Sequence, residues 1–358
     1  MIEDIQSTDK ATLALFDAII DVRSPSEFAE DHLPGAINLP VLNDAERAEV
    51  GTIYKQVSRF DARRIGAAYV ARNVASHLQT VLAGKPAKFR PLLYCWRGGM
   101  RSNSMATILS LVGWRVGVLN GGYKTWRRAV VGALRSEEPL SLVLLDGQTG
   151  TAKSDILRRL PQAGAQTLDL EAYARHRGSV FGGFPSAPQP PQKLFESRIW
   201  EAMQSLDLSR PIVVEAESSK IGECEIPKRL WTAMLAAPRI VVTAAPKARA
   251  RYLLKAYSDI ASDRNAVLSA VDRLRPFHAR ETIAEWEALA DAGALAALAE
   301  ALMERHYDPA YARSRARGKS GGEIASFSLD ALDAATFERV AQEIASRLGS
   351  ATLKGIRP

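Results

Sequence analysis

The chain has 358 residues, which at about 150 residues per domain predicts two domains. Its hydrophobic fraction of 47% and charged fraction of 24% are ordinary for a folded chain, so the composition excludes wholesale disorder, collagen and a small disulfide-stapled fold. The formal net charge of +7 favours an anionic partner, although a solvated arginine-rich surface gives the same charge.

Cysteine usage and hydropathy bear on the compartment. The chain has 2 cysteines, Cys95 and Cys224, too few for a disulfide framework or a four-cysteine zinc site, so we expect a reducing, cytoplasmic environment. The longest apolar run, residues 288–303, contains Asp291 and Glu300. It is also shorter than the roughly 20 residues of a membrane span, so we expect no membrane association.

Apolar stretches of strand length alternate with helical periodicity in the first part of the chain. We expect strands at 16–22, 33–40, 91–95 and 116–122, and helices at 25–32, 44–83, 105–114 and 123–134. Strands alternating with helices indicate a parallel sheet that is covered on both faces. We assign residues 1–135 to this first domain, because the polar segment 135–139 follows it.

A second α/β pattern occupies residues 136–358. We expect strands at 140–147, 211–217 and 238–244, a helix at 153–160, and a mostly helical region from about 246 onward with an Arg/Lys-rich loop at 313–319. The Gly/Pro-rich segment 181–192 fits neither a helix nor a strand.

A cysteine stands between a predicted strand and a predicted helix. Cys95 is followed by two glycines, Gly98 and Gly99, whose turn can direct backbone N–H groups at an anion. The following helix N-terminus and the charges of Arg97 and Arg101 would favour a thiolate. Such a thiolate suits attack on sulfur, selenium or phosphorus, whereas the alternative is an inert cysteine buried at a strand end.

A glycine loop opens the second domain. Residues 146–154, DGQTGTAKS, resemble a P-loop, in which backbone amides cradle phosphates and a lysine reaches the terminal ones. Gly147, Gly150, Lys153 and Ser154 match the motif, but Ala152 stands where a glycine is usual. We expect Ala152 to have a negative φ, because alanine avoids the left-handed region.

Two further segments of the second domain carry polar groups. Glu215 and Glu217 end the strand 211–217 and are candidates for binding a metal or positioning water, or are simply solvated carboxylates. Polar and aromatic residues share a loop without periodicity, which suggests a site for a ligand that is partly apolar and partly anionic. These loop residues are His176, Arg177, Ser179, Phe181 and Phe184.

The first domain resembles a rhodanese domain. The resemblance rests on DVRSPSEFAEDHLPGAINLP (21–40), YCWRGGMRS (94–102) and LNGGYKTW (119–126), and covers about residues 17–128. The usual sulfurtransferase loop has four residues between its cysteine and arginine, whereas five separate Cys95 from Arg101. A longer loop, as in rhodanese-like phosphatases, leaves room for a tetrahedral oxyanion. The loop therefore allows either chalcogen transfer or phosphate ester hydrolysis.

The combination of motifs resembles the bacterial tRNA 2-selenouridine synthase family over essentially the whole chain. It joins the cysteine loop and the P-loop-like segment to ERAEVGTIYKQ (46–56), HRGSVFGG (176–183), EAESSKIG (215–222) and YDPAY (307–311). The resemblance implies an N-terminal rhodanese-like parallel-sheet domain and a C-terminal P-loop NTPase-like α/β domain with a helical C-terminal region.

The resemblance also implies a substrate and a reaction. Proteins of this family act on tRNA with 2-thiouridine at the wobble position. They attach a geranyl group to the sulfur from geranyl diphosphate and replace the sulfur by selenium from selenophosphate. We expect no tightly bound cofactor and assign no metal ligands, while Mg²⁺ at the P-loop stays open.

The resemblance implies a role for each residue that stands at a matching position of these motifs. Cys95 would carry selenium as a perselenide or orient the selenium donor. Selenophosphate would bind to Arg97, Gly98, Gly99, Arg101 and Ser102, and the diphosphate to Gly147, Gln148, Thr149, Gly150, Lys153 and Ser154. His176, Arg177, Ser179 and Phe181 would contact the prenyl chain or the tRNA. Eight basic residues would either contact tRNA phosphates or be solvated. They are Arg63, Arg64, Arg127, Arg128, Arg313, Arg315, Arg317 and Lys319.

Two other functions compete with this interpretation. A cysteine-dependent phosphatase would use the loop at Cys95 but gives the second domain no role. A tRNA-binding or nucleotide-switched regulatory protein would bind RNA in a salt-sensitive way without chemistry at Cys95.

Overall fold

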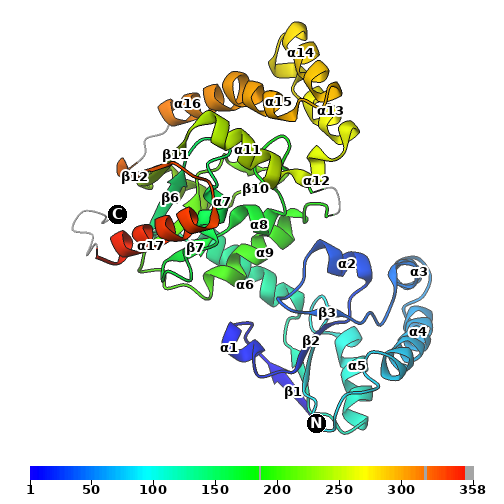
Figure 1. Ribbon diagram of the computed structural model, residues 1–358. Helices are drawn as coiled ribbons and strands as arrows, with labels where there is room; N and C mark the ends of the chain where they lie inside the picture. Colours follow the sequence, from blue (N-terminus) through cyan, green and yellow to red (C-terminus); the bar gives the residue numbers. More distant parts are fainter. Residues whose placement is uncertain (185–186, 318–320, 351–358) are drawn as a thin grey trace. The chain divides into compact units, whose positions relative to one another are not determined.

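The computed structural model describes residues 1–184, 187–317 and 321–350 of the chain. It divides into two compact units (Figure 1): residues 1–135 with 191–204, and residues 136–190 with the chain from 205 onward. The sequence analysis placed all of 136–358 in one domain, whereas the helix within 191–204 packs with the first unit.

The first unit contains one parallel sheet of 5 strands, in the order β1-β5-β4-β2-β3. Its strands are β1 (Ile2–Ile5), β2 (Ala18–Asp21), β3 (Ile37–Asn38), β4 (Pro91–Tyr94) and β5 (Val116–Leu119). Its helices are α1 (Lys10–Leu13), α2 (Pro25–Glu30), α3 (Asp44–Gln56), α4 (Arg59–Gln79), α5 (Met100–Leu111), α6 (Tyr123–Arg135) and α9 (Gln192–Met203). All residues of β4 and β5 are buried, as expected for central strands covered on both faces.

Two expectations for this unit need correction. The segment 44–83 is two helices, because α3 ends near Val57 and the Ser58 side chain caps the N-terminus of α4 by accepting from the Asp61 N–H. The strand β1, which the sequence analysis did not predict, pairs in parallel with β5. The remaining strands and helices predicted for the unit are present.

The second unit contains another parallel sheet of 5 strands, in the order β12-β11-β6-β8-β7. Its strands are β6 (Leu142–Asp146), β7 (Gln166–Leu168), β8 (Ile212–Glu215), β11 (Arg239–Ala244) and β12 (Glu323–Leu329), beside a short antiparallel pair, β9 (Lys220–Ile221) and β10 (Cys224–Glu225). Its helices are α7 (Lys153–Leu157), α8 (Leu170–Ala174), α10 (Lys228–Ala236), α11 (Pro246–Ala256), α12 (Ser258–Ala261), α13 (Arg264–Asp272), α14 (Arg280–Asp291), α15 (Leu295–Leu302), α16 (Asp308–Arg317) and α17 (Ala334–Ser350). The strand β6, which precedes the glycine loop, lies between β8 and β11, at the centre of the sheet.

The region after 246 is less uniformly helical than expected. The strand β12 completes the sheet, with alternate residues Ala325, Phe327 and Leu329 buried in its core. Residues 313–317, predicted as a loop, form the end of α16. Lys319 and the side chains of Arg315 and Arg317 lie outside the described residues.

The helices α12–α15 form a hydrophobic cluster of their own around Trp286, apart from the core on the sheet. Among the described residues, none of the helices is both long enough and apolar enough to cross a membrane.

Candidate functional site

The Cys95 thiol lies in a cradle of hydrogen-bond donors. It follows the buried strand β4 and is itself buried, with a relative exposure of 4%. The Gly99 N–H donates to Sγ at 3.2 Å and the Ser102 hydroxyl donates at 3.3 Å. Burial raises the pKa of Cys95, but the bonds from the Ser102 hydroxyl and from the N–H groups of Arg97, Ser102 and Gly99 outweigh it. The pKa of the thiol is therefore lowered, which favours the thiolate.

Glycines allow a second loop to lie directly against the cysteine loop. Gly122 has φ +58°, and a Cβ there would lie 2.2 Å from the Cys95 carbonyl oxygen. Gly98 has φ +64°, and a Cβ there would lie 2.7 Å from the Leu119 carbonyl oxygen. The Tyr123 N–H donates to the Cys95 carbonyl at 2.8 Å. The close approach of the two backbones therefore requires glycine and holds Cys95 in place.

The two arginines of the cysteine loop lie differently. Arg97 is exposed, whereas Arg101 makes an ion pair with Glu27 of α2 at 2.6 Å. Burial raises the pKa of Glu27, but the bonds and charge of Arg101 outweigh it and lower that pKa. The structure brings Gly99 and Ser102 to the sulfur, while Arg101 bonds a carboxylate, so its predicted role with selenophosphate stays a prediction.

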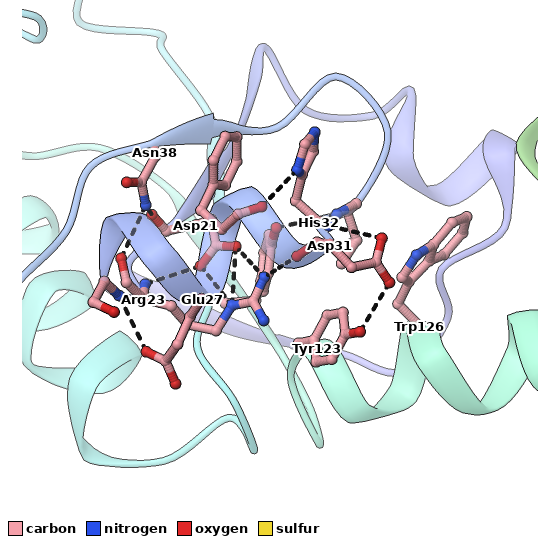
Figure 2. Close-up of polar contacts among 12 residues, drawn as sticks. Asp21, Arg23, Glu27, Asp31, His32, Asn38, Tyr123 and Trp126 are labelled. Carbon is pink, nitrogen blue, oxygen red and sulfur yellow. Dashed lines mark hydrogen bonds and ion pairs between the residues drawn. The ribbon is translucent and has the colours of Figure 1, made fainter. Parts of the chain in front are cut away.

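Figure 2 shows a buried polar network that includes Tyr123, whose backbone N–H donates to the Cys95 carbonyl. Arg23 donates to both carboxylate oxygens of Asp21, with the shortest bond at 2.6 Å, and its guanidinium lies 4.1 Å from the centre of the Tyr123 ring. Asp31 accepts from the Tyr123 hydroxyl at 2.8 Å and from the Ser197 hydroxyl of α9 at 2.9 Å. Burial raises the pKa of Asp31 despite these bonds. The network explains why α9 packs with the first unit.

The glycine loop of the second unit connects β6 to α7 and encloses a lysine. Lys153 is buried, and its Nζ donates to the Gly147 carbonyl at 2.9 Å and to the Tyr311 hydroxyl at 3.4 Å. Burial lowers the pKa of Lys153, but the charges of Tyr311 and of three nearby glutamates outweigh it, so the pKa is raised and the lysine stays a cation.

The expectation for Ala152 is wrong. Its φ is +59°, in the left-handed region, where a residue other than glycine costs about 1–2 kcal/mol. The loop needs this conformation directly before Lys153, so the backbone keeps the shape that a glycine would give. The buried Ala152 side chain packs in the hydrophobic core on the sheet, which offsets part of that cost.

Arg249 of α11 holds the loop from behind, and sequence reasoning missed it. It is 1% exposed, and it donates to the Thr149 carbonyl at 2.7 Å and to the Gln148 side chain at 3.1 Å. The two terminal nitrogens of its guanidinium make a bidentate ion pair with Asp308, at 3.0 and 2.7 Å. Asp308 lies in the YDPAY segment, so one role of that segment is to anchor the glycine loop.

Three carboxylates gather beside the loop. Oxygen atoms of Glu171, Glu215 and Glu217 lie within 4.8 Å of one another, and the Ser154 hydroxyl donates to Glu171 at 3.2 Å. Burial raises the pKa of all three carboxyl groups, and the charge of Glu215 raises those of Glu171 and Glu217 further. Glu215 and Glu217 were candidates from the sequence for binding a metal or positioning water, whereas Glu171 was not.

The glycine loop and the polar–aromatic segment line one cleft of about 900 Å³. Its lining includes Gly150, Lys153, Ser154, Glu171, His176, Arg177, Ser179, Glu215, Glu217, Tyr307 and Tyr311. Arg177 makes an ion pair with Asp259 at 2.9 Å and lies over the rings of Phe184 and Tyr257. The structure thus brings four of the predicted diphosphate-binding residues together with His176, Arg177 and Ser179, namely Thr149, Gly150, Lys153 and Ser154. Gly147 and Gln148 do not line the cleft.

An apolar pocket adjoins this cleft. It has a volume of about 90 Å³ and shares Thr149, Ser179, Tyr257 and Tyr307 with the cleft. Its other walls are apolar side chains of α11, of the helical cluster and its end, and of the neighbouring loop, among them Phe181, Leu254, Ile260, Val267, Leu298, Ala299, Leu302 and Met303. Phe181 therefore lines the apolar pocket rather than the cleft.

The predicted basic pairs are partly engaged in the fold. Arg127 makes ion pairs with Glu196 and, at 4.0 Å, with Asp31, so it belongs to the buried network. Arg64 pairs with Asp61 at 3.3 Å, while Arg63, Arg128 and Arg313 are exposed.

The fold and the two sites define a class of protein. A rhodanese-like domain, with a cysteine surrounded by hydrogen-bond donors, is joined in one chain to a domain with a P-loop-like glycine loop. Residues 4–129 match the family model described as rhodanese-like domain, and residues 140–270 match the model described as tRNA 2-selenouridine synthase AAA domain.

Curated relatives named tRNA 2-selenouridine synthase resemble the chain across both units. The protein of Nitrosomonas europaea is 40% identical over 230 residues, which are 63% of this chain and 59% of the relative. The protein of Shewanella denitrificans is 35% identical over 263 residues, 72% of this chain and 68% of the relative. That of Marinobacter nauticus is 33% identical over 279 residues, 72% of this chain and 74% of the relative. The chain belongs to the tRNA 2-selenouridine synthase family.

Proposed function

We propose that this chain forms 2-selenouridine in tRNA in two steps. It first transfers a geranyl group from geranyl diphosphate to the sulfur of the wobble 2-thiouridine, and then replaces that sulfur by selenium from selenophosphate. The observation that carries the first step is the apolar pocket beside the phosphate cradle. Such a pair of sites suits a ligand with an anionic head and an apolar tail.

The geranyl step uses the second unit. The diphosphate lies on the glycine loop, where Lys153 neutralises the charge that develops on the leaving group. The prenyl chain enters the apolar pocket past Ser179 and Tyr257, which line both spaces. The thiouridine sulfur attacks the first carbon of the chain, the carbon–oxygen bond to the diphosphate breaks, and the base loses its N3 proton.

The cleft has room for more than the diphosphate. Its volume of about 900 Å³ leaves space for a base beside the phosphate cradle. Arg175 and Lys255 are exposed and line the cleft, where they suit contacts with tRNA phosphates.

The selenium step uses Cys95. The Cys95 thiolate can attack either the selenium or the phosphorus of selenophosphate, and the balance of electrons distinguishes the two reactions. Attack of the thiolate on selenium would make a perselenide, but phosphorus would then have to leave with the bonding pair as phosphite. Attack on phosphorus forms a sulfur–phosphorus bond and releases selenium with the bonding pair as hydrogen selenide, and no oxidation state changes. Water then cleaves the phosphocysteine to phosphate. We favour attack on phosphorus.

The released selenide completes the exchange. It attacks the carbon that carries the geranylated sulfur, and the geranyl thiolate leaves. An alkylated sulfur is a better leaving group than a thiocarbonyl sulfur, which gives the geranyl step its purpose.

Mass spectrometry of nucleosides tests this function. Thiouridine-containing tRNA is incubated with geranyl diphosphate alone or with selenophosphate added, using the parent chain and Cys95→Ala. We expect geranylthiouridine from both proteins and selenouridine from the parent chain alone. If the parent makes neither product while aryl phosphates are hydrolysed in a Cys95-dependent way, the chain is a phosphatase instead.

A further inference from the structure

The strongest unassigned feature is the cluster of three glutamates beside the glycine loop. Glu171 lies in the first turn of α8, Glu215 is the last residue of β8, and Glu217 follows two residues later. One oxygen of each carboxylate lies within 4.8 Å of the others. Like charges at such distances repel one another, and the single positive charge of the nearby Lys153 offsets only part of the charge of three carboxylates.

A second observation points into the same cluster. Glu215 is 4% exposed, and its Oε1 is buried without a hydrogen-bond partner among the described residues. A buried carboxylate oxygen is normally paired, because leaving it unpaired costs free energy. The nearby Lys153 does not supply the partner, since its Nζ donates to the Gly147 carbonyl and the Tyr311 hydroxyl. Within the described residues, the three glutamates make no ion pair.

The surroundings of the cluster complete a pocket of oxygen atoms. The Ser154 hydroxyl lies 3.2 Å from Glu171 Oε2 and offers a neutral oxygen. Gly178 closes one side, because a Cβ there would lie 2.6 Å from a Glu171 oxygen and 2.8 Å from a Glu217 oxygen. The other side opens into the cleft that also contains Lys153. An ion in this position would be reachable from the cleft.

We propose that Glu171, Glu215 and Glu217 together bind one hard divalent cation of the Mg²⁺ or Mn²⁺ type. Carboxylate and hydroxyl oxygens suit such hard cations, whereas thiolate and imidazole ligands are typical of zinc and copper sites. In a P-loop, Mg²⁺ is held by a serine or threonine hydroxyl together with substrate phosphates. Three protein carboxylates let this chain bind its cation before any phosphate arrives. The proposal therefore does not depend on the identity of the diphosphate or of the tRNA product.

Titration of the full chain with Mn²⁺, free of phosphate, tests the site. Electron paramagnetic resonance measures free Mn²⁺, and competition with Mg²⁺ measures the affinity for Mg²⁺. We expect one Mn²⁺ per chain, displaced by Mg²⁺, and a Kd raised at least about tenfold in Glu215→Gln and in Glu217→Gln. Glu223→Gln, which changes an exposed glutamate of the same unit, should bind as the parent does.

Thermal unfolding of each protein with and without Mn²⁺ gives a second test, which still distinguishes the outcomes if a substitution itself changes the stability. Mn²⁺ should raise the Tm of the parent and of Glu223→Gln, because it binds the native state, and should leave the Tm of Glu215→Gln unchanged. Absence of saturable binding in the parent would overturn the proposal, and so would parental affinity in both cluster variants. In those cases the glutamates share protons instead of holding a cation.

Discussion

At the scale of single residues, the proposed chemistry rests on two titratable groups in buried surroundings. The Cys95 thiolate is stabilised by donors from its own loop, and the Lys153 ammonium is held by a carbonyl and a hydroxyl. These surroundings favour the charged form of each group, because they lower the pKa of Cys95 and raise that of Lys153.

The first prediction concerns the pKa of Cys95. Because hydrogen bonds favour its charged form, the thiol should react with iodoacetamide at a pH below that at which an ordinary cysteine does. In Ser102→Ala one donor is lost, the pKa rises, and the pH profile shifts upward. Mass spectrometry of the Cys95 peptide measures the rate, with the buried Cys224 as an internal control. Identical profiles for the two proteins would contradict the role of Ser102.

The second prediction concerns the atom that Cys95 attacks. Incubation of the chain with selenophosphate should release selenide and inorganic phosphate, with a phosphocysteine that acid quenching preserves. Phosphorus NMR distinguishes phosphate from phosphite, and Cys95→Ser is the control for spontaneous hydrolysis. Phosphite formed only with the parent chain would show attack on selenium, and hence a perselenide.

At the scale of elements, the glycine loop depends on helices that lie far along the chain. Arg249 of α11 and Asp308 of α16 hold the loop through its backbone and through Gln148. The ion pair is buried on the arginine side, at 1% exposure, and partly open on the aspartate side, at 26%. Its purpose is to position the loop rather than to react.

The third prediction concerns this pair. Arg249→Met should lower the free energy of unfolding by about 2 kcal/mol or more, because Asp308 and the Thr149 carbonyl lose their partner. Asp308→Leu in the same chain should restore part of that loss, since no unpaired charge is left. Chemical denaturation of both single variants and the double variant gives the coupling. Strict additivity would show that the pair does not act as a unit.

The fourth prediction concerns the apolar pocket. Ala299→Phe on α15 should fill the pocket and raise the KM for geranyl diphosphate about tenfold or more, because the prenyl chain loses its space. Ala297→Phe, at an exposed position of the same helix, is the matched control. Selenation of tRNA that already carries the geranyl group should proceed at the parental rate in both variants. An unchanged KM in Ala299→Phe would show that the prenyl chain of geranyl diphosphate does not bind in this pocket.

At the scale of the whole molecule, two units with separate cores each contain one of the two sites. The cysteine cradle depends on contacts within the first unit, and the phosphate cradle on contacts within the second. The two proposed half-reactions should therefore be separable by mutation. The surface as a whole carries a net charge of +7, which suits a polyanion.

The fifth prediction concerns that charge. Affinity for tRNA should fall at least about tenfold between about 50 and 200 mM salt, because phosphate contacts release counterions. Filter binding at several salt concentrations measures the slope. Arg175→Ala should weaken binding and reduce the slope, whereas Arg64→Ala, which removes a residue already paired with Asp61, should not. A salt-independent affinity would contradict an electrostatic tRNA surface.

The sequence by itself determined the family, the alternation of strands and helices in both units, and the two loops on which the proposed chemistry rests. It could do so because each loop is contiguous: the donors around Cys95 lie within a few residues of it, and Lys153 bonds a carbonyl of its own loop. The φ of Ala152 was predicted wrongly, because closure of the loop outweighs the local preference of alanine.

Only the tertiary structure decided which residues from distant parts of the chain lie against these loops. Glu171 was missed because β7 is short and only partly buried, so no apolar run marked the strand that brings it beside Glu215. Arg249 looks like its neighbours Lys247 and Arg251 in sequence, and only its burial against the glycine loop distinguishes it. Such contacts join segments far apart in the chain, and no local periodicity encodes them.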